Sequence, residues 1–237
     1  MPTPSRAFDG SDMTSVAKSV QVLIWNIFII ICVGVLIYIF WIKEKKRTKE
    51  LSLLAASLKL NFSHKDNEGL FDKMNKFHLF SVGHSKRIKN LIEGDANNAE
   101  LSIFDYQYTT GGGQHSHTCR QSVFCIRSPK LCLPYFSMRP EGIFHKIGGA
   151  FGYQDIDFKS HPEFSKKYLL RGENEESIRQ LFNKNLLKNI ESQQKISIEG
   201  GGNQLAFYRH KKRIKPDDIE SFMDEGFYFF KLFLEAT

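Results

Sequence analysis

The chain has 237 residues, a hydrophobic fraction of 41% and a formal net charge of +7 at pH 7. The hydrophobic fraction is close to that of a globular protein, and 21 phenylalanines supply enough apolar surface for a substantial core. Residues 1–42 carry no net charge, whereas residues 43–50 hold five basic side chains against two acidic ones. A basic cluster beside a hydrophobic segment favours an anionic membrane surface as its counter-charge, so we expect no nucleic-acid partner.

A hydrophobic segment covers residues 20–42 and contains no charged side chain. As a helix rising about 1.5 Å per residue it spans roughly 34 Å, enough to cross a hydrocarbon core of about 30 Å. Trp25 lies near one end and Tyr38 and Trp41 near the other, as aromatic rings do at the two membrane interfaces. A cleaved signal peptide would be shorter and end in small residues, and a buried helix is seldom apolar all round for this length. We therefore predict a single transmembrane helix.

Flanking charge predicts the orientation of this helix. Residues 1–19 contain two basic side chains and are polar and small, so we expect them to be disordered and outside the cell. The positive-inside rule places the C-terminal side in the cytoplasm of a plasma (inner) membrane. We expect the five basic side chains after the segment to contact lipid headgroups: Lys43, Lys45, Lys46, Arg47 and Lys49.

Residues 43–60 are predicted to form a juxtamembrane helix. Leu51, Leu54, Ala55 and Leu58 recur at helical spacing and make one apolar stripe. Such a helix could lie on lipid headgroups or dock on the core of the following domain. Docking is favoured because few lysines flank the stripe.

Residues 61–237 are predicted to form one cytosolic α+β domain. Strand-like runs separated by turn formers occur at residues 77–82, 87–93, 101–108, 117–127 and 131–136. In the third run Leu101, Ile103 and Asp105 share one face, and Phe104, Tyr106 and Tyr108 share the other. Short strands with short connections indicate an antiparallel β-meander covered by helices.

The C-terminal half alternates between expected helices and strands. We expect a short helix at residues 140–147, a strand at 168–171, and a helix capped by Asn174. Residues 196–199 and 204–209 flank a glycine-rich turn and predict a hairpin. Pro216 opens a final amphipathic helix, whose apolar stripe is Ile219, Phe222, Met223, Phe229 or Phe230, and Phe233.

One candidate metal site lies in the fourth strand-like run. His115, His117 and Cys119 alternate, so on a strand they would share one face and could hold zinc, with Cys125 or Cys132 as a fourth ligand. The alternative is a polar hairpin end with a small buried thiol. An odd number of cysteines after the membrane segment indicates free thiols in a reducing compartment.

A pair of carboxylates is the second candidate. Asp155 and Asp157 share a face, with Glu163 nearby, and could bind a hard cation or divide acid and base roles. The alternative is the solvent face of a short strand, with Ile156 and Phe158 pointing inward.

Glycine clusters and a basic run are weaker signals. Residues 111–113, 148–152 and 200–202 contain glycine clusters without the spacing of a phosphate-binding loop, so turns explain them better. Residues 209–213, with Lys215, are strongly basic and could contact phosphate groups, although a solvated loop is the simpler interpretation.

Three stretches between residues 118 and 182 carry a resemblance to other proteins: SVFCIRSPKLCLPYFSMRPEG, KIGGAFGYQDIDF and HPEFSKKYLLRGENEESIRQLF. They resemble an uncharacterised family of bacterial single-pass membrane proteins of unassigned function. The resemblance implies a bacterial inner-membrane setting. It brings no activity, cofactor or catalytic residue.

These patterns predict a membrane-anchored cytosolic interaction or scaffold module without a cofactor. Its partners would be the lipid bilayer and another membrane or cytosolic protein. One alternative is a metal-dependent or hydrolytic enzyme using Asp155 and Asp157, or His115, His117 and Cys119. Another is an anionic-lipid sensor using residues 43–49 and 209–215.

Overall fold

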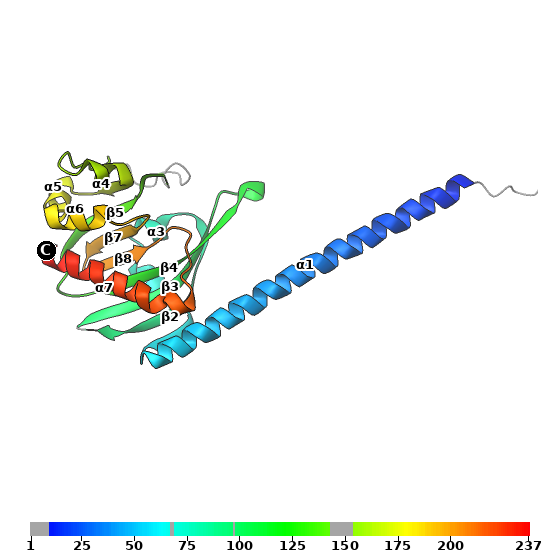
Figure 1. Cartoon of the computed structure of the whole chain (residues 1–237), viewed down its shortest axis with the longest axis horizontal. Coiled ribbons are helices and arrows are strands. Elements are labelled where there is room, and N and C mark those ends of the chain that lie inside the picture. Colours follow the sequence, from blue (N-terminus) through cyan, green and yellow to red (C-terminus); the bar gives the residue numbers. More distant parts are fainter. Residues whose placement is uncertain (1–9, 67–68, 97, 143–153) are drawn as a thin grey trace, which may run out of the picture. The chain divides into compact units, whose positions relative to one another are not determined.

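The computed structural model describes residues 10–66, 69–96, 98–142 and 154–237 (Figure 1). The chain divides into two compact units, Met1–Lys49 and Glu50–Thr237. The predicted helix at 140–147 falls mostly outside the described residues, as do Gly148, Gly149 and Gly152.

Helix α1 (Gly10–Ser57) is continuous through the hydrophobic segment. The large apolar side chains between Val20 and Ile42 are exposed. By length and composition α1 contains a candidate membrane span, the one such helix among the described residues. Leu51 and Ala55, near its C-terminal end, are 2% and 0% exposed in the core of the second unit. This burial confirms that the stripe in residues 51–58 docks on the domain.

The second unit is an α+β domain built on an eight-stranded antiparallel sheet. The strand order is β1-β2-β3-β4-β8-β7-β5-β6. The strands are β1 (Asn61–Lys65), β2 (His84–Ala96), β3 (Ala99–Thr110), β4 (His117–Arg127), β5 (Leu133–Pro140), β6 (Tyr168–Gly172), β7 (Ser197–Gly202) and β8 (Gln204–Tyr208). The first four form an antiparallel meander, in which β2, β3 and β4 are the strands predicted at residues 87–93, 101–108 and 117–127. The fifth does not continue it, because the hairpin β7–β8 pairs with β4 and lies between β4 and β5.

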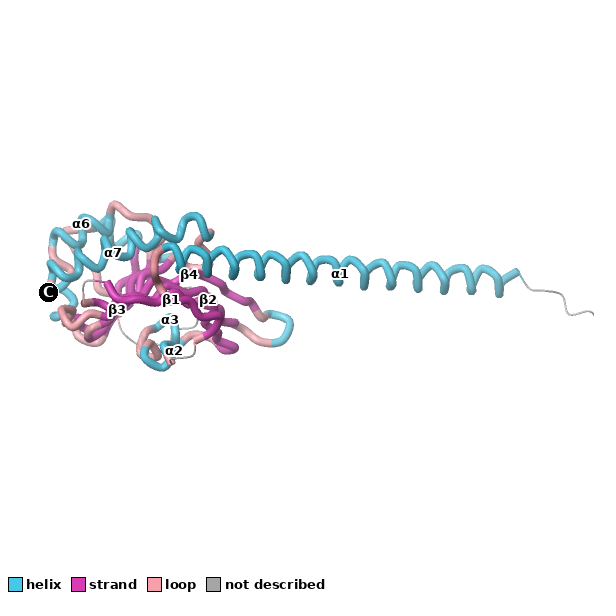
Figure 2. The backbone as a smooth tube through the Cα atoms, turned by 90° about the horizontal axis from the view of Figure 1, so that it is seen from below, coloured by secondary structure: helices cyan, strands magenta, loops and turns pink. Residues whose placement is uncertain are grey.

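Helices cover both faces of this sheet. The longer helices are α5 (Glu175–Leu181), α6 (Lys184–Glu191) and α7 (Ile219–Ala236), and the shorter ones are α2 (Leu70–Lys73), α3 (His78–Ser81) and α4 (Pro162–Lys167). Single 3₁₀ turns occur at Gly113–His115 and Pro216–Asp218. Figure 2 shows α6 and α7 on one face of the sheet and α2 and α3 on the other.

The face under α5–α7, here called the helical face, carries the larger core. Leu101, Ile103 and Phe124 of the meander point into it. Phe207 of β8 packs on Phe222 and Phe229 of α7, with ring centroids 5.2 and 4.9 Å apart. The predicted stripe of the final helix is thus confirmed.

The opposite face, here called the α2–α3 face, carries a smaller core. Phe104, Tyr106 and Tyr108 lie there, as their alternation with Leu101 and Ile103 predicts. Phe77 and Phe80 come from the covering segment. The strand predicted at residues 77–82 is wrong, because this segment forms α3 instead. Four consecutive buried residues, 77–80, do not fit the alternation of a half-buried strand.

Two caps position the helices after β6. The Asn174 side chain accepts a hydrogen bond from Ser177 N (2.9 Å), which confirms the predicted cap of α5. Asn183 caps α6 in the same way, through Leu186 N (3.0 Å). Helix α6 was not predicted, nor were β1, α2 and α4. β1, α2 and α4 are short, and their apolar residues are too few to show a period. In α6, Leu186, Leu187 and Ile190 do share one helical face, a signal that the sequence analysis missed.

Candidate functional site

Strands β6, β5 and β7 lie side by side and present a row of polar side chains to the α2–α3 face. Ser137 on β5 lies opposite Arg171 on β6 and Glu199 on β7. Because side chains alternate along a strand, Tyr135 and Arg139 share the face of Ser137. Phe136 and Met138 point instead into the core of the helical face.

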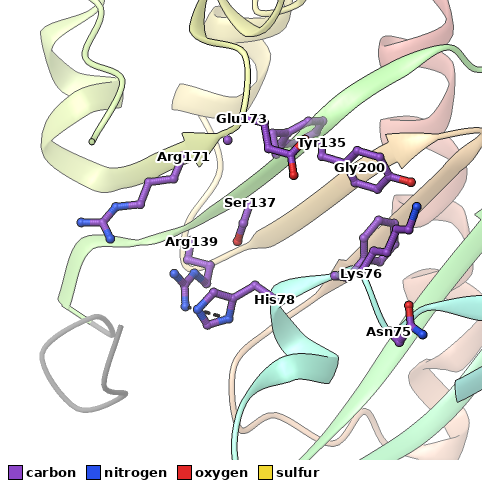
Figure 3. Close-up of a pocket in the computed structure, with 12 residues that line it drawn as sticks. Asn75, Lys76, His78, Tyr135, Ser137, Arg139, Arg171, Glu173 and Gly200 are labelled. Atoms are coloured by element: carbon purple, nitrogen blue, oxygen red, sulfur yellow. Dashed lines mark hydrogen bonds between the residues drawn. The ribbon is translucent and has the colours of Figure 1, made fainter. Parts of the chain in front are cut away.

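A cavity of about 370 Å³ lies where residues 75–78 meet β5 and β6 (Figure 3). Its volume falls in the range of small-molecule sites. Phe77 and Tyr135 supply aromatic surface. Its charged lining residues are Lys76, Arg139, Arg171 and Glu173, three cations against one carboxylate.

Arg139 and His78 form the most buried polar pair in this lining. They are 7% and 5% exposed, and Arg139 Nη1 lies 3.5 Å from His78 Nδ1 (Figure 3). Burial and the charge of Arg139 lower the pKa of His78 to about 4. The imidazole is therefore neutral at pH 7, and its Nδ1 can accept from the guanidinium. The positive charge of the pair rests on Arg139.

Glu199 fixes one wall of the cavity from beneath. Its carboxylate is 1% exposed and accepts hydrogen bonds from Leu79 N (3.1 Å) and from the Tyr208 hydroxyl (2.6 Å). Burial raises the pKa of Glu199, and these hydrogen bonds oppose that rise. The backbone contact holds α3 against β7 and thereby positions residues 75–78.

Two glycines of β7 let aromatic rings lie flat against the sheet. A Cβ on Gly201 would overlap the Tyr135 ring, and one on Gly200 would overlap the Phe136 ring on the other face. These glycines were predicted to belong to the hairpin turn. They continue the strand instead, and the turn follows at Gly202, where φ is 58°.

The candidate zinc residues do not converge. His115 and His117 are exposed at the β3–β4 connection, whereas Cys119 is buried beside Tyr108 on the α2–α3 face. Cys125 is buried further along β4, and Cys132 is exposed. No group of three or more His, Cys, Asp or Glu side chains in the described ranges is placed to hold a metal ion.

The candidate carboxylate pair is also divided. Asp155 accepts a hydrogen bond from Leu170 N (2.9 Å), and Asp157 is exposed. Ile156 and Phe158 are buried, as the alternative interpretation expected, although residues 154–158 form no strand. Burial raises the pKa of Asp155.

The basic run at residues 209–213 is tied to the domain rather than loosely solvated. Arg209 pairs with Glu225 of α7 (2.6 Å), and Arg213 pairs with the buried Asp105 (3.0 Å). Asp105 also accepts from Asn90 Nδ2 and Ser122 Oγ, each at 3.0 Å. Two of the cations that a lipid-sensing patch would need are thus engaged within the domain.

The basic residues after the hydrophobic segment lie on α1. Lys45 Nζ lies 3.7 Å from the centroid of the Trp41 ring, within the range of a cation–π contact. Contact of Lys43, Lys45, Lys46, Arg47 and Lys49 with lipid stays a prediction.

Sequence reasoning missed the cavity. Its residues come from four segments between positions 75 and 200, and no catalytic or ligand-binding motif joins them. The one local signal is the alternation of Tyr135, Ser137 and Arg139, which places an aromatic ring, a hydroxyl and a guanidinium on one face of a strand.

Comparisons with known proteins give one informative result. No protein-family model matches the chain, and no curated protein sequence matches it. Among solved structures, the mycobacterial trehalose monomycolate transport factor A, TtfA, is similar with a TM-score of 0.58 and 11% sequence identity. The similarity covers 80% of this chain and 93% of that one. At this identity the match shows a shared fold.

Proposed function

We propose that this chain is a membrane-anchored accessory module, which holds a cytosolic α+β domain at the bilayer to act with another membrane or cytosolic protein. The observation that carries the proposal is the exposed apolar surface of α1 between Val20 and Ile42. Water solvates such a surface poorly, and lipid tails solvate it well.

The charge distribution supports an orientation with the second unit in the cytoplasm. Five basic residues follow the apolar segment directly, and the positive-inside rule retains such residues on the cytoplasmic side. Together with the resemblance to bacterial single-pass proteins, this orientation supports a bacterial inner membrane as the proposed location. The same five residues would contact anionic headgroups.

The shared fold supports an accessory role. TtfA is named a trehalose monomycolate transport factor. We extend only that general role to this chain: a tethered domain that raises the local concentration of a binding surface near membrane partners.

Membrane fractionation tests the anchor. We expect the full-length chain to stay in the pellet after an alkaline carbonate wash and to dissolve in detergent. A variant with Ile30→Arg and Ile31→Arg should insert less, because each arginine near a helix centre costs about 2.5 kcal/mol or more. Recovery of the unaltered chain in the carbonate supernatant would contradict the proposal.

Reporter fusions test the orientation. A fluorescent protein fused after Thr237 should be bright, and alkaline phosphatase at the same position should be inactive. The reverse pattern would place the domain outside and overturn the cytosolic assignment while leaving the anchor intact.

A further inference from the structure

We infer that the cavity between residues 75–78 and strands β5 and β6 binds an anionic amphiphile, a molecule with a carboxylate or phosphate group next to an apolar chain or ring. This ligand class goes beyond the proposed function. It does not depend on the orientation of the anchor, and it has a test of its own.

The order of side chains along β5 gives the cavity an aromatic end and a cationic end. Tyr135, Ser137 and Arg139 follow each other on one face, so an aromatic group, a hydroxyl and a guanidinium occur in that order over about 13 Å. Figure 3 shows Arg139 and Arg171 toward one side of the cavity and Tyr135 toward the other. The cavity is therefore amphipathic along its length.

The charges of the lining favour an anion at the arginine end. Lys76 and Glu173 lie toward Tyr135 and are of opposite sign, so the net positive charge of the described lining comes from Arg139 and Arg171. Asp155 and Glu199 lie behind this wall, accept backbone hydrogen bonds, and do not line the cavity. A guanidinium presents several donors in a planar fork that suits both carboxylate and phosphate.

The central hydroxyl also lacks an internal partner. Ser137 Oγ is buried and has no hydrogen-bond partner in the part of the chain that the structure describes. A buried hydroxyl without a partner is unfavourable, and an acceptor on a ligand would relieve this. Ser137 lies opposite Arg171 and two residues from Arg139, so the three side chains belong to the same face of the sheet and an anion at Ser137 would lie beside Arg139.

The aromatic end provides the apolar contact. Phe77 is 3% exposed and is held in the core of the α2–α3 face, so its position is fixed. The ring of Tyr135 lies against the backbone of Gly201, where a side chain would displace it. The fixed ring of Phe77, the half-buried ring of Tyr135 and a buried guanidinium resemble the usual composition of small-molecule sites, mostly apolar with a few placed polar groups.

Soluble six-carbon probes test the ligand class on the full chain in nanodiscs of zwitterionic lipid. Saturation-transfer-difference NMR would measure dissociation constants for hexanoate, hexyl phosphate, hexan-1-ol and hexylamine, with empty nanodiscs as the blank. We expect at least one anion to bind tenfold or more tightly than the alcohol and the amine. The ratio between hexanoate and hexyl phosphate would show whether the head group is a carboxylate or a phosphate.

Three variants locate the binding. Arg139→Gln and Arg171→Gln should each weaken the preferred anion about tenfold or more, and Ser137→Leu should weaken it by filling the cavity. Arg127→Gln is the matched control, because it removes one arginine charge from an exposed pair with Glu100 outside the cavity. If Arg139→Gln does not fold, Arg171→Gln and Ser137→Leu still decide the question.

The inference is overturned if neither anion binds at millimolar concentration. It is also overturned if the alcohol binds as tightly as both anions, or if Arg171→Gln and Ser137→Leu leave the affinity unchanged. A failed fractionation assay would remove the anchor and leave this result standing, so the two proposals fail separately.

Discussion

The two faces of the eight-stranded sheet are covered by segments of different kinds. On the helical face, α5–α7 bring long apolar stripes onto the strands, and phenylalanine rings fill the space between them. On the α2–α3 face the cover consists of two single-turn helices with the chain between them. Glu199, Arg139 and His78 are buried there.

The difference follows from backbone hydrogen bonding. A long helix satisfies most of its own N–H groups and can press a wholly apolar surface against a sheet. A single turn leaves N–H groups without helical partners, and buried side chains must accept from them, as Glu199 does from Leu79. The α2–α3 segment does not extend over β6, and the cavity lies in the part of the sheet that it leaves uncovered. The proposed binding site therefore lies on the face that is covered by single-turn helices and not by longer ones.

The largest effect is expected on the helical face. Phe207→Ala should lower the free energy of unfolding by about 3–5 kcal/mol, because it removes a fully buried ring that packs on two rings of α7. Denaturant unfolding of the full chain in detergent would measure it. Phe207→Leu keeps most of the volume and should cost clearly less, and equal losses in the two variants would contradict the packing argument.

A loss of stability of similar size, with a different cause, is expected on the α2–α3 face. Glu199→Leu should destabilise the fold by roughly 3 kcal/mol, because it leaves Leu79 N–H and the Tyr208 hydroxyl buried without an acceptor. Glu199→Gln keeps one carbonyl oxygen and should lose about half as much. If Glu199→Leu were neutral, the carboxylate would not be what holds α3 on the sheet.

The α2–α3 face should also respond to acid. The pKa of His78 is lowered to about 4 by burial and by Arg139 and Arg171, and burial, Lys211 and Arg139 lower that of His210 to about 4. The unfolded chain binds these protons near pH 6.5 and the folded chain does not, so stability is full above about pH 6.5 and falls as the pH drops toward 4. For His78 the loss approaches roughly 3 kcal/mol.

Variants separate this response from that of the carboxylates. His78→Gln should reduce the decline in the free energy of unfolding between pH 6.5 and 4. Adding His210→Gln in a double variant should remove the part of the decline that is due to His210. Unfolding curves at half-unit pH steps would show it. A decline of the same slope in the double variant would assign the effect to other groups.

The smallest changes in stability are expected when two glycines, one on each face of the sheet, are replaced by alanine. A Cβ on Gly226 would overlap the Phe124 ring, which is enclosed in the helical core, so Gly226→Ala should cost about 1–3 kcal/mol. Gly201→Ala meets the Tyr135 ring, which is half-buried at the cavity and can turn aside. Its cost should stay below about 1 kcal/mol. Thermal unfolding of both variants would measure these two losses of stability. A larger loss for Gly201→Ala than for Gly226→Ala would mean that the Tyr135 ring is held more rigidly than the Phe124 ring.

The amino-acid sequence by itself determined the features that depend on near neighbours. The length of the apolar segment defined the candidate span in α1, and helical spacing predicted the stripe of α7. Alternation assigned Leu101 and Tyr106 to opposite faces, and Asn174 marked the start of α5. Each of these signals lies within a few residues, where periodicity and capping chemistry act.

Tertiary structure alone decided the strand order and the site. The hairpin β7–β8 pairs with β4 and β5 through backbone hydrogen bonds, which every residue type can make. No side-chain pattern therefore predicts that it lies between them. The same pairing brings Ser137 beside Arg171 and Glu199, which are far apart in the chain. Residues 78–81 form a helix and not the predicted strand, and the four buried residues at 77–80 show no period that could have distinguished the two.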